Sequence, residues 1–232
     1  MDRPFPKLKF CGLTRREDVA VAIDLGADAI GLNFFPASPR FVGEKWSDSL
    51  LESYRGQVES GRLLAVGVFV NWTPHQVAKA IKRFGLNCVQ LHGDEDPTWL
   101  DQADKLSPFN EVTYLKAVSW GGAEDESIVL DWGLCAHPRL LGLLVDSFDP
   151  IQRGGTGKTV RWDLLDPRPA PFSDKKIMLA GGLRPENVQI AITTANPDGL
   201  DIASGIELSP GIKDHAAMKA IAESSKNWKP PS

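Results

Sequence analysis

The chain has 232 residues, a formal net charge of −4, 42% hydrophobic residues and 24% charged residues. This balance is ordinary for a globular protein, and basic residues scattered along a mildly acidic chain do not predict a nucleic-acid-binding surface. The longest apolar runs, such as residues 63–70, are too short to span a membrane, and three cysteines cannot form a full disulfide framework. The N-terminal MDRPFPKLKF has no apolar signal region, so the sequence predicts a cytoplasmic protein without a membrane partner.

The first half of the chain alternates apolar runs with helical segments. Strand candidates are KLKFC (7–11), DAIGLNF (28–34), LLAVGVFV (63–70) and CVQLH (88–92). Capping residues mark the helices that follow the first three of these strands. Thr14 and Glu17 predict a capping box before a helix that ends at Gly26, and a second helix is expected to begin near Ser47. Thr73-Pro74 with Gln76 predict the start of a third helix, which stops at Gly85.

The second half continues this alternation in the same order. Strand candidates are VTYLKAV (112–118), LLGLLVD (140–146), KIMLA (176–180) and LDIAS (200–204). Helices are expected near residues 97–106, 125–136 and 161–166, after Pro185, and from near Asp214.

Eight strands that alternate with eight helices favour parallel strands joined by helical crossovers. A (β/α)8 barrel typically has about 250 residues. We therefore predict a single-domain α/β protein, a (β/α)8 TIM barrel over residues 1–232, with the ordered barrel at about 7–225 and a short C-terminal tail. A doubly wound open sheet is the alternative, but it rarely has eight such even units.

Two reactive side chains are expected at the barrel mouth, where the strands end and active sites of such barrels lie. Cys11 shares a strand face with Lys7 and Lys9, so the lysines should lie beneath a cysteine that points into the mouth. Cationic neighbours can lower a cysteine pKa, although a strand cysteine is more often a small buried hydrophobe. Asp146 leaves a buried strand for the same mouth, where it is either a general acid or a loop-capping aspartate.

Glycine-rich segments follow the last three predicted strands. QRGGTGKTVRW (152–162) resembles a nucleotide-binding P-loop, but Gln152 occupies the position of the first glycine of that template. Phosphate sites in these barrels form at the loops after the seventh and eighth strands, where AGGL (180–183) and ASGIE (203–207) place glycines. We expect these loops to bind the phosphate group of a small-molecule substrate, with residues 154–158 closing over the same region.

The HGDED segment raises the question of a metal site. His92 with Asp94 and Glu95 is an incomplete ligand set, because neither an HExxH helix nor a second nearby histidine accompanies it. The sequence therefore predicts no metal.

Taken together, the βα junctions resemble phosphoribosylanthranilate isomerase, an enzyme of tryptophan biosynthesis. The matching segments are KFCGLTRREDV (9–19), GADAIGLNFFPASPRFV (26–42), VGVFVN (66–71), VQLHGDE (89–95), LLVDS (143–147), GGTGKTVRW (154–162), LAGGLRPENV (179–188) and LDIASGIELSPGIKD (200–214). They cover nearly every junction in order, and residues 98–140 match least.

The resemblance implies an Amadori rearrangement of N-(5′-phosphoribosyl)anthranilate to 1-(2-carboxyphenylamino)-1-deoxyribulose 5-phosphate, with no cofactor or metal. It implies that Cys11 is the general base that takes the C2′ proton and that Asp146 is the general acid that protonates the ribose ring oxygen. Arg40 would hold the anthranilate carboxylate, where a guanidinium can pair bidentately. Supporting substrate contacts are expected from His92 and Asp201, and phosphate contacts from Gly155, Gly181, Gly182, Ser204 and Gly205.

Other functions stay open at this point. The related aminoaldose isomerase of the histidine pathway performs the same rearrangement on a doubly phosphorylated substrate, but it resembles a two-aspartate design, and Cys11 argues against it. A non-catalytic phosphate-binding barrel is a second alternative. The sequence leaves the choice between a monomer and a homodimer open.

Overall fold

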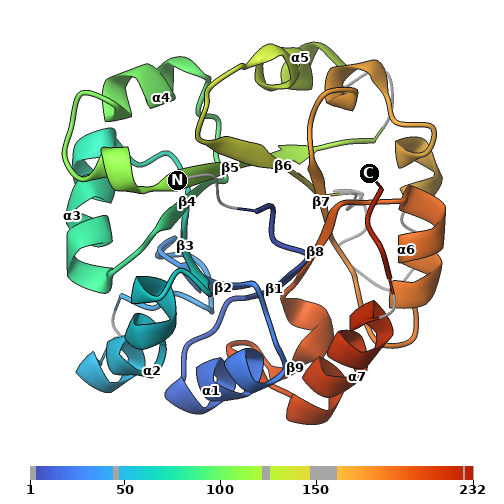
Figure 1. Cartoon of the computed structure of the whole chain (residues 1–232), viewed down its shortest axis with the longest axis horizontal. Coiled ribbons are helices and arrows are strands. Elements are labelled where there is room, and N and C mark those ends of the chain that lie inside the picture. Colours follow the sequence, from blue (N-terminus) through green and yellow to red (C-terminus); the bar gives the residue numbers. More distant parts are fainter. Residues whose placement is uncertain (1–3, 44–46, 122–125, 147–160, 227, 232) are drawn as a thin grey trace.

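Eight parallel strands close into a barrel in sequence order (Figure 1). The computed structural model describes residues 4–43, 47–121, 126–146, 161–226 and 228–231. The strands are β1 (Leu8–Cys11), β2 (Ala29–Asn33), β3 (Leu64–Phe69), β4 (Cys88–Leu91), β5 (Thr113–Ser119), β6 (Leu140–Asp146), β7 (Ile177–Ala180) and β8 (Gly199–Ile202). β8 pairs with β1 to close the sheet, so the predicted (β/α)8 barrel is confirmed.

Helices surround the barrel as an outer ring (Figure 1). They are α1 (Arg16–Asp24), α2 (Asp48–Glu59), α3 (Pro74–Phe84), α4 (Thr98–Ala103), α5 (Glu126–Leu134), α6 (Val188–Ala195) and α7 (His215–Lys226). After β6, where a short helix near residues 161–166 was predicted, the described residues form a 3-10 helix at Trp162–Leu165 and a second one at Ala170–Phe172. None of the described helices is long and apolar enough to cross a membrane.

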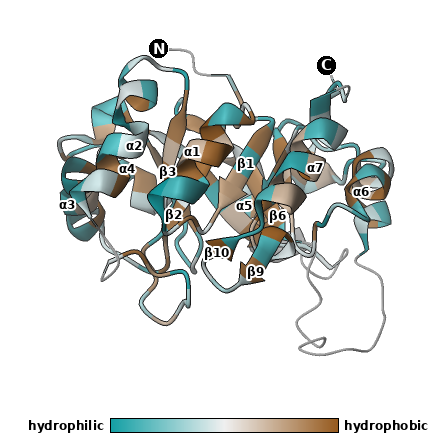
Figure 2. Cartoon of the chain, turned by 90° about the horizontal axis from the view of Figure 1, so that it is seen from below, coloured by the Kyte–Doolittle hydropathy of each residue, from teal (hydrophilic) through white to brown (hydrophobic). Residues whose placement is uncertain are grey.

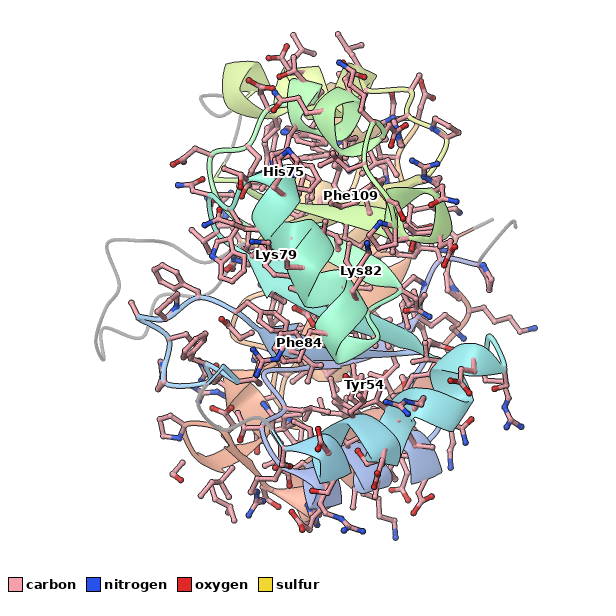
Figure 3. The ribbon with its side chains drawn as sticks, turned by 90° about the vertical axis from the view of Figure 1, so that its left-hand side faces the viewer. Tyr54, His75, Lys79, Lys82, Phe84 and Phe109 are labelled. Carbon is pink, nitrogen blue, oxygen red and sulfur yellow. The ribbon has the colours of Figure 1, made fainter. Side chains whose placement is uncertain are left out.

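The third helix follows its sequence signals. Thr73 and Gln76 form the predicted capping box, Pro74 is the first helical residue, and Gly85 ends the helix with a φ of 58°. Figure 3 shows Lys79 and Lys82 on the outer side of α3. Phe84 is buried against the barrel, and its carbonyl oxygen accepts a 2.5 Å hydrogen bond from the Tyr54 hydroxyl of α2. The apolar side of this helix therefore packs inward, as its pattern predicts.

The first helix begins differently from the prediction. The N-cap is Arg15, without a side-chain capping bond, so the predicted capping box of Thr14 with Glu17 is wrong. The Thr14 hydroxyl instead donates to the Gly211 carbonyl oxygen at 2.6 Å. Gly211 belongs to a hairpin that sequence reasoning missed, formed by β9 (Glu207–Ser209) and β10 (Ile212–Lys213) beyond the end of β8 (Figure 2). Thr14 thus bonds to a residue distant in the chain and does not cap the helix that follows it.

Strand alternation sorts the side chains of β1 between the two faces of the sheet. Leu8 and Phe10 belong to the main apolar core cluster, together with residues of the surrounding helices such as Val19 and Ala22 of α1. Lys9 points the opposite way and is fully buried inside the barrel. Lys7, expected on that same face, donates instead to the Trp228 carbonyl oxygen. A charged residue in the barrel interior requires buried partners, and these shape the site above it.

Candidate active site

A cavity of about 600 Å³ opens at the carboxyl ends of the strands. Every predicted site residue that the structure describes lines it: Cys11, Arg40, His92, Asp146, Gly181, Gly182, Asp201, Ser204 and Gly205. The predicted phosphate residue Gly155 lies outside the described residues. A second cavity of similar volume adjoins the first and shares Val70, His92 and Asp146 with it. The fold therefore brings together residues that are up to 194 positions apart, from Cys11 to Gly205.

Cys11 ends β1 and is only 8% exposed. Its Sγ lies over Gly31 of β2, where an added Cβ would come within 2.6 Å of the sulfur. Burial and the negative charge of Asp201 raise the pKa of the Cys11 thiol, and together they outweigh the lowering by Lys9 and Lys213. Lys9 and Lys213 do lower the pKa, but burial and Asp201 of the neighbouring strand β8 outweigh them, so the expectation of a lowered thiol pKa is wrong in direction.

Lys9 lies directly beneath Cys11 and has two partners inside the barrel. Its ammonium group donates to Asp201 at 2.8 Å and to the side-chain oxygen of Gln90 at 2.9 Å. Burial opposes the charge on Lys9, but Asp201 and Cys11 outweigh it, so the pKa of Lys9 is raised. The lysine is thus a fixed cation, and Asp201, predicted to bind substrate, is engaged in a buried ion pair.

Asp146 is the last residue of β6, in register with Ala180 of β7 and Ser119 of β5. Its side chain is half-buried and lines both cavities. In the barrel order, β7 and β8 separate β6 from β1. Asp146 and Cys11 consequently face the cavity from different sides, as the sequence predicts for an acid–base pair.

Arg40 is held in place by a carboxylate that sequence reasoning missed. Its Nε donates to Oε1 of Glu207 at 2.8 Å and its Nη2 to Oε2 at 2.6 Å. Lys213 adds a 2.9 Å bond to the same Glu207. Gly12, at a φ of 72°, leaves room for this arrangement, because a Cβ there would lie 2.4 Å from Cδ of Arg40. One edge of the guanidinium is occupied by Glu207, and among the described residues Nη1 has no hydrogen-bond partner, so this nitrogen can donate to a ligand anion.

The loops after β7 and β8 meet at glycines. Gly181 and Gly182 have φ values of 84° and 64°, a region that strongly favours glycine. A Cβ on Gly205 would lie 1.8 Å from the carbonyl oxygen of Leu183, so the two loops are in close backbone contact. The Asn187 side chain donates to the Gly182 carbonyl at 2.9 Å and fixes the first loop. These loops can present backbone amides to an anion.

Glu95, in the acidic segment after β4, is hydrogen-bonded to other groups of the same chain. Glu95 accepts from the backbone amides of Asn71 and Gly93 and from the Lys116 ammonium group. Within the part of the chain that the structure describes, no three His, Cys, Asp or Glu side chains are grouped so that they could hold a metal ion. Glu95 therefore ties the loops after β3 and β4 to β5.

Comparison with known proteins gives one consistent result. The family model of N-(5′-phosphoribosyl)anthranilate (PRA) isomerase matches residues 8–224. The N-(5′-phosphoribosyl)anthranilate isomerase of Citrifermentans bemidjiense is 35% identical over 221 residues, which cover 95% of this chain and 97% of the relative. The crystal structure of phosphoribosyl anthranilate isomerase from Thermotoga maritima is 31% identical, with a TM-score of 0.76 over 96% of this chain and 99% of that one. A phosphoribosyl anthranilate isomerase in complex with reduced 1-(o-carboxyphenylamino)-1-deoxyribulose 5-phosphate is also similar, with 30% identity, a TM-score of 0.74 and the same coverage of both chains.

Proposed function

Because the chain belongs to the N-(5′-phosphoribosyl)anthranilate isomerase family, we propose that the mouth cavity is its active site, with Cys11 as general base and Asp146 as general acid. The protein is an intramolecular aldose–ketose isomerase of tryptophan biosynthesis. It converts N-(5′-phosphoribosyl)anthranilate to 1-(2-carboxyphenylamino)-1-deoxyribulose 5-phosphate. The observation that carries the assignment of roles is that both side chains line one cavity from separated strands.

The two groups act in sequence. Asp146 donates a proton to the ribose ring oxygen as the C1′–O bond breaks, and the anthranilate nitrogen lone pair forms the iminium. The Cys11 thiolate then takes the C2′ proton, and the electron pair of the C–H bond forms the C1′–C2′ double bond of an enolamine. Transfer of a proton to C1′ and loss of the enol proton give the aminoketone. Acid and base catalysis each contribute typically about 10²–10⁴-fold to such steps.

The remaining residues orient the substrate. The free edge of Arg40 receives the anthranilate carboxylate, because a guanidinium fork matches a carboxylate. The glycine loops after β7 and β8, with Ser204, receive the phosphate. A substrate held at both ends places the ribose carbons between Cys11 and Asp146.

Turnover of phosphoribosylanthranilate, generated in situ and followed by the loss of its fluorescence, tests the whole assignment. Rapid turnover by the purified protein supports it. The same preparation is offered the doubly phosphorylated aminoaldose of the histidine pathway. A clear preference for that substrate, or an inert folded protein, would contradict the proposed cavity chemistry.

We expect Glu207→Gln to raise the KM about tenfold with kcat changed only a few-fold. Hydrogen bonds to charged groups contribute about 1.5–3 kcal/mol, and the amide keeps only one of the two acceptors that orient Arg40. Steady-state kinetics of this variant measure the effect. Glu223→Gln on the exposed side of α7 is the matched control and should behave like the unmodified enzyme. A fall in kcat at constant KM would contradict an orienting role.

Gly205→Ala is expected to weaken phosphate binding. The added methyl would overlap the Leu183 carbonyl oxygen, so the loops after β7 and β8 must separate. Misplacing a bound substrate by about 1 Å can lower the reaction rate about 10²-fold. We expect the KM and the inhibition constant of inorganic phosphate to rise together. Gly56→Ala in α2, where an added Cβ meets nothing within 4 Å, is the control. An unchanged inhibition constant would place the phosphate elsewhere.

We further propose that the enzyme works in the cytoplasm, where a charged phosphorylated intermediate stays within the compartment that makes it. It acts there on a small molecule, without a nucleic-acid or membrane partner. Cell fractionation tests the location. Sedimentation equilibrium distinguishes a monomer of 25.3 kDa from a homodimer.

A further inference from the structure

A chain of four polar side chains crosses the barrel interior, and three of them, Asp201, Gln90 and His92, line the mouth cavity. Asp201 of β8 accepts from Lys9 of β1 at 2.8 Å, and Lys9 donates to the side-chain oxygen of Gln90 in β4 at 2.9 Å. The side-chain nitrogen of Gln90 lies 2.8 Å from Nδ1 of His92. Lys9 and Gln90 are at most 1% exposed, and Asp201 is 8% exposed. The chain therefore begins at a buried carboxylate and ends at an imidazole that lines the cavity.

The chemistry of these groups allows only one direction for the hydrogen bonds. A lysine ammonium group has three donors and no acceptor, so the Gln90 carbonyl oxygen must face Lys9. The amide NH2 of Gln90 must then face His92 and donate to it. Nδ1 of His92 accepts that bond, which it can do only without a proton. In a neutral ring the hydrogen consequently resides on Nε2.

The surroundings of His92 favour the neutral ring. Burial and the positive charges of Lys9 and Lys116 lower the pKa of His92 more than the carboxylates of Asp201 and Glu95 raise it. Lys9 itself stays charged, since Asp201 holds its proton in place. A charged His92 ring would also carry a hydrogen on Nδ1, so that two hydrogen-bond donors, Nδ1 and the Gln90 amide, would face each other. Neutral His92 therefore keeps one hydrogen, and Gln90 determines where that hydrogen is.

We propose that Lys9 and Gln90 are positioning residues that fix His92 as its Nε2–H tautomer, so that His92 donates a hydrogen bond to a substrate oxygen and takes no proton. This deepens the proposed function and rests on the cavity being the isomerase site. Within the described part of the chain, the structure gives Nε2 no protein acceptor, and His92 lines both adjoining cavities. Asp201, predicted to contact substrate, acts in this scheme through Lys9.

Nitrogen NMR of the histidine rings tests the tautomer without turnover. The protein has four histidines, and the His92 signals are those lost in His92→Gln. Two-bond 1H–15N spectra at neutral pH should show a protonated Nε2 and an unprotonated Nδ1. A hydrogen on Nδ1, alone or with one on Nε2, would overturn the proposal. Because no substrate is involved, this result is independent of whether the isomerase assignment holds.

Replacing the Gln90 amide donor with an acceptor tests whether Gln90 determines the tautomer of His92. Gln90→Glu has the same shape but offers only acceptors when ionised, so the His92 signals should show a hydrogen on Nδ1. Gln90→Met, which removes the bond without replacing it, should give a mixture of tautomers. If Gln90→Glu leaves Nδ1 unprotonated, Gln90 does not set the tautomer. Thermal melting of each variant confirms that the barrel is folded.

Kinetics of two variants at position 92 test the donor role. Glutamine can place an amide N–H near the position of Nε2, whereas glutamate of the same size offers only acceptors. Because glutamine keeps a neutral donor, we expect His92→Gln to lower kcat/KM by about tenfold or less. His92→Glu should lower it at least about tenfold further. Equal losses in the two variants would show that His92 does not act as a donor.

Discussion

Replacing Cys11 by serine is expected to lower kcat by about 10³-fold or more, close to the upper range for loss of a general base. A serine hydroxyl occupies the same place at the end of β1 but is a far weaker acid than a thiol, so almost none of it ionises. Substrate binding should change little, because Arg40 and the glycine loops are untouched. Fluorescence-detected turnover at saturating substrate measures kcat, and thermal melting checks the fold.

Cys135→Ser is the matched control, because Cys135 is a free cysteine that does not line the cavity. It should leave kcat within a few-fold of the unmodified enzyme. The pH profile adds a second readout. Since the pKa of Cys11 is raised, the thiolate fraction grows with pH through and above the usual range near 8.5. The residual kcat/KM of Asp146→Asn, which no longer depends on a protonated carboxyl group at position 146, should rise with this fraction. A Cys11→Ser variant that keeps near-normal rates would remove the residue from the mechanism.

The sequence predicts best where a signal and its structural consequence are close together in the chain. Thr73, Pro74 and Gln76 define a helix start within four residues, and the structure forms it as expected. Thr14 carries the same kind of signal but bonds to Gly211, 197 residues away. Capping residues have several possible partners of similar energy, so packing decides between them. Local rules therefore predict the barrel but not each helix start.

The electrostatics of the site could not be predicted from spacing. Alternation along β1 correctly directs Lys9 into the barrel, but the thiol above it also faces Asp201 from β8. The sign of a pKa shift depends on the sum of burial and all nearby charges, and here burial and Asp201 together outweigh the two lysines. Sequence reasoning likewise missed Glu207, which is 167 residues from Arg40. In VQLH, by contrast, Gln90 and His92 share a strand face, a signal that could have linked them.

Replacing Asp146 by asparagine is expected to lower kcat by about 10²–10⁴-fold, because an amide has the shape of the carboxyl group but no proton to transfer to the ring oxygen. Ring opening should then limit the reaction. With substrate deuterated at C2′, the isotope effect on kcat should shrink in Asp146→Asn and persist or grow in Cys11→Ser, where C–H cleavage is the impaired step. Parallel rate measurements with labelled and unlabelled substrate give this comparison.

Asp163→Asn is the control, since this exposed aspartate pairs with Arg161 and does not line the cavity. The isotope pattern separates two ways in which Asp146→Asn could be slow. A damaged cavity would slow every step and leave the isotope effect close to that of the unmodified enzyme, whereas loss of the acid slows only ring opening. A slow Asp146→Asn enzyme with an undiminished isotope effect would therefore contradict the assignment of Asp146 as the general acid, even though the residue would still be needed for activity.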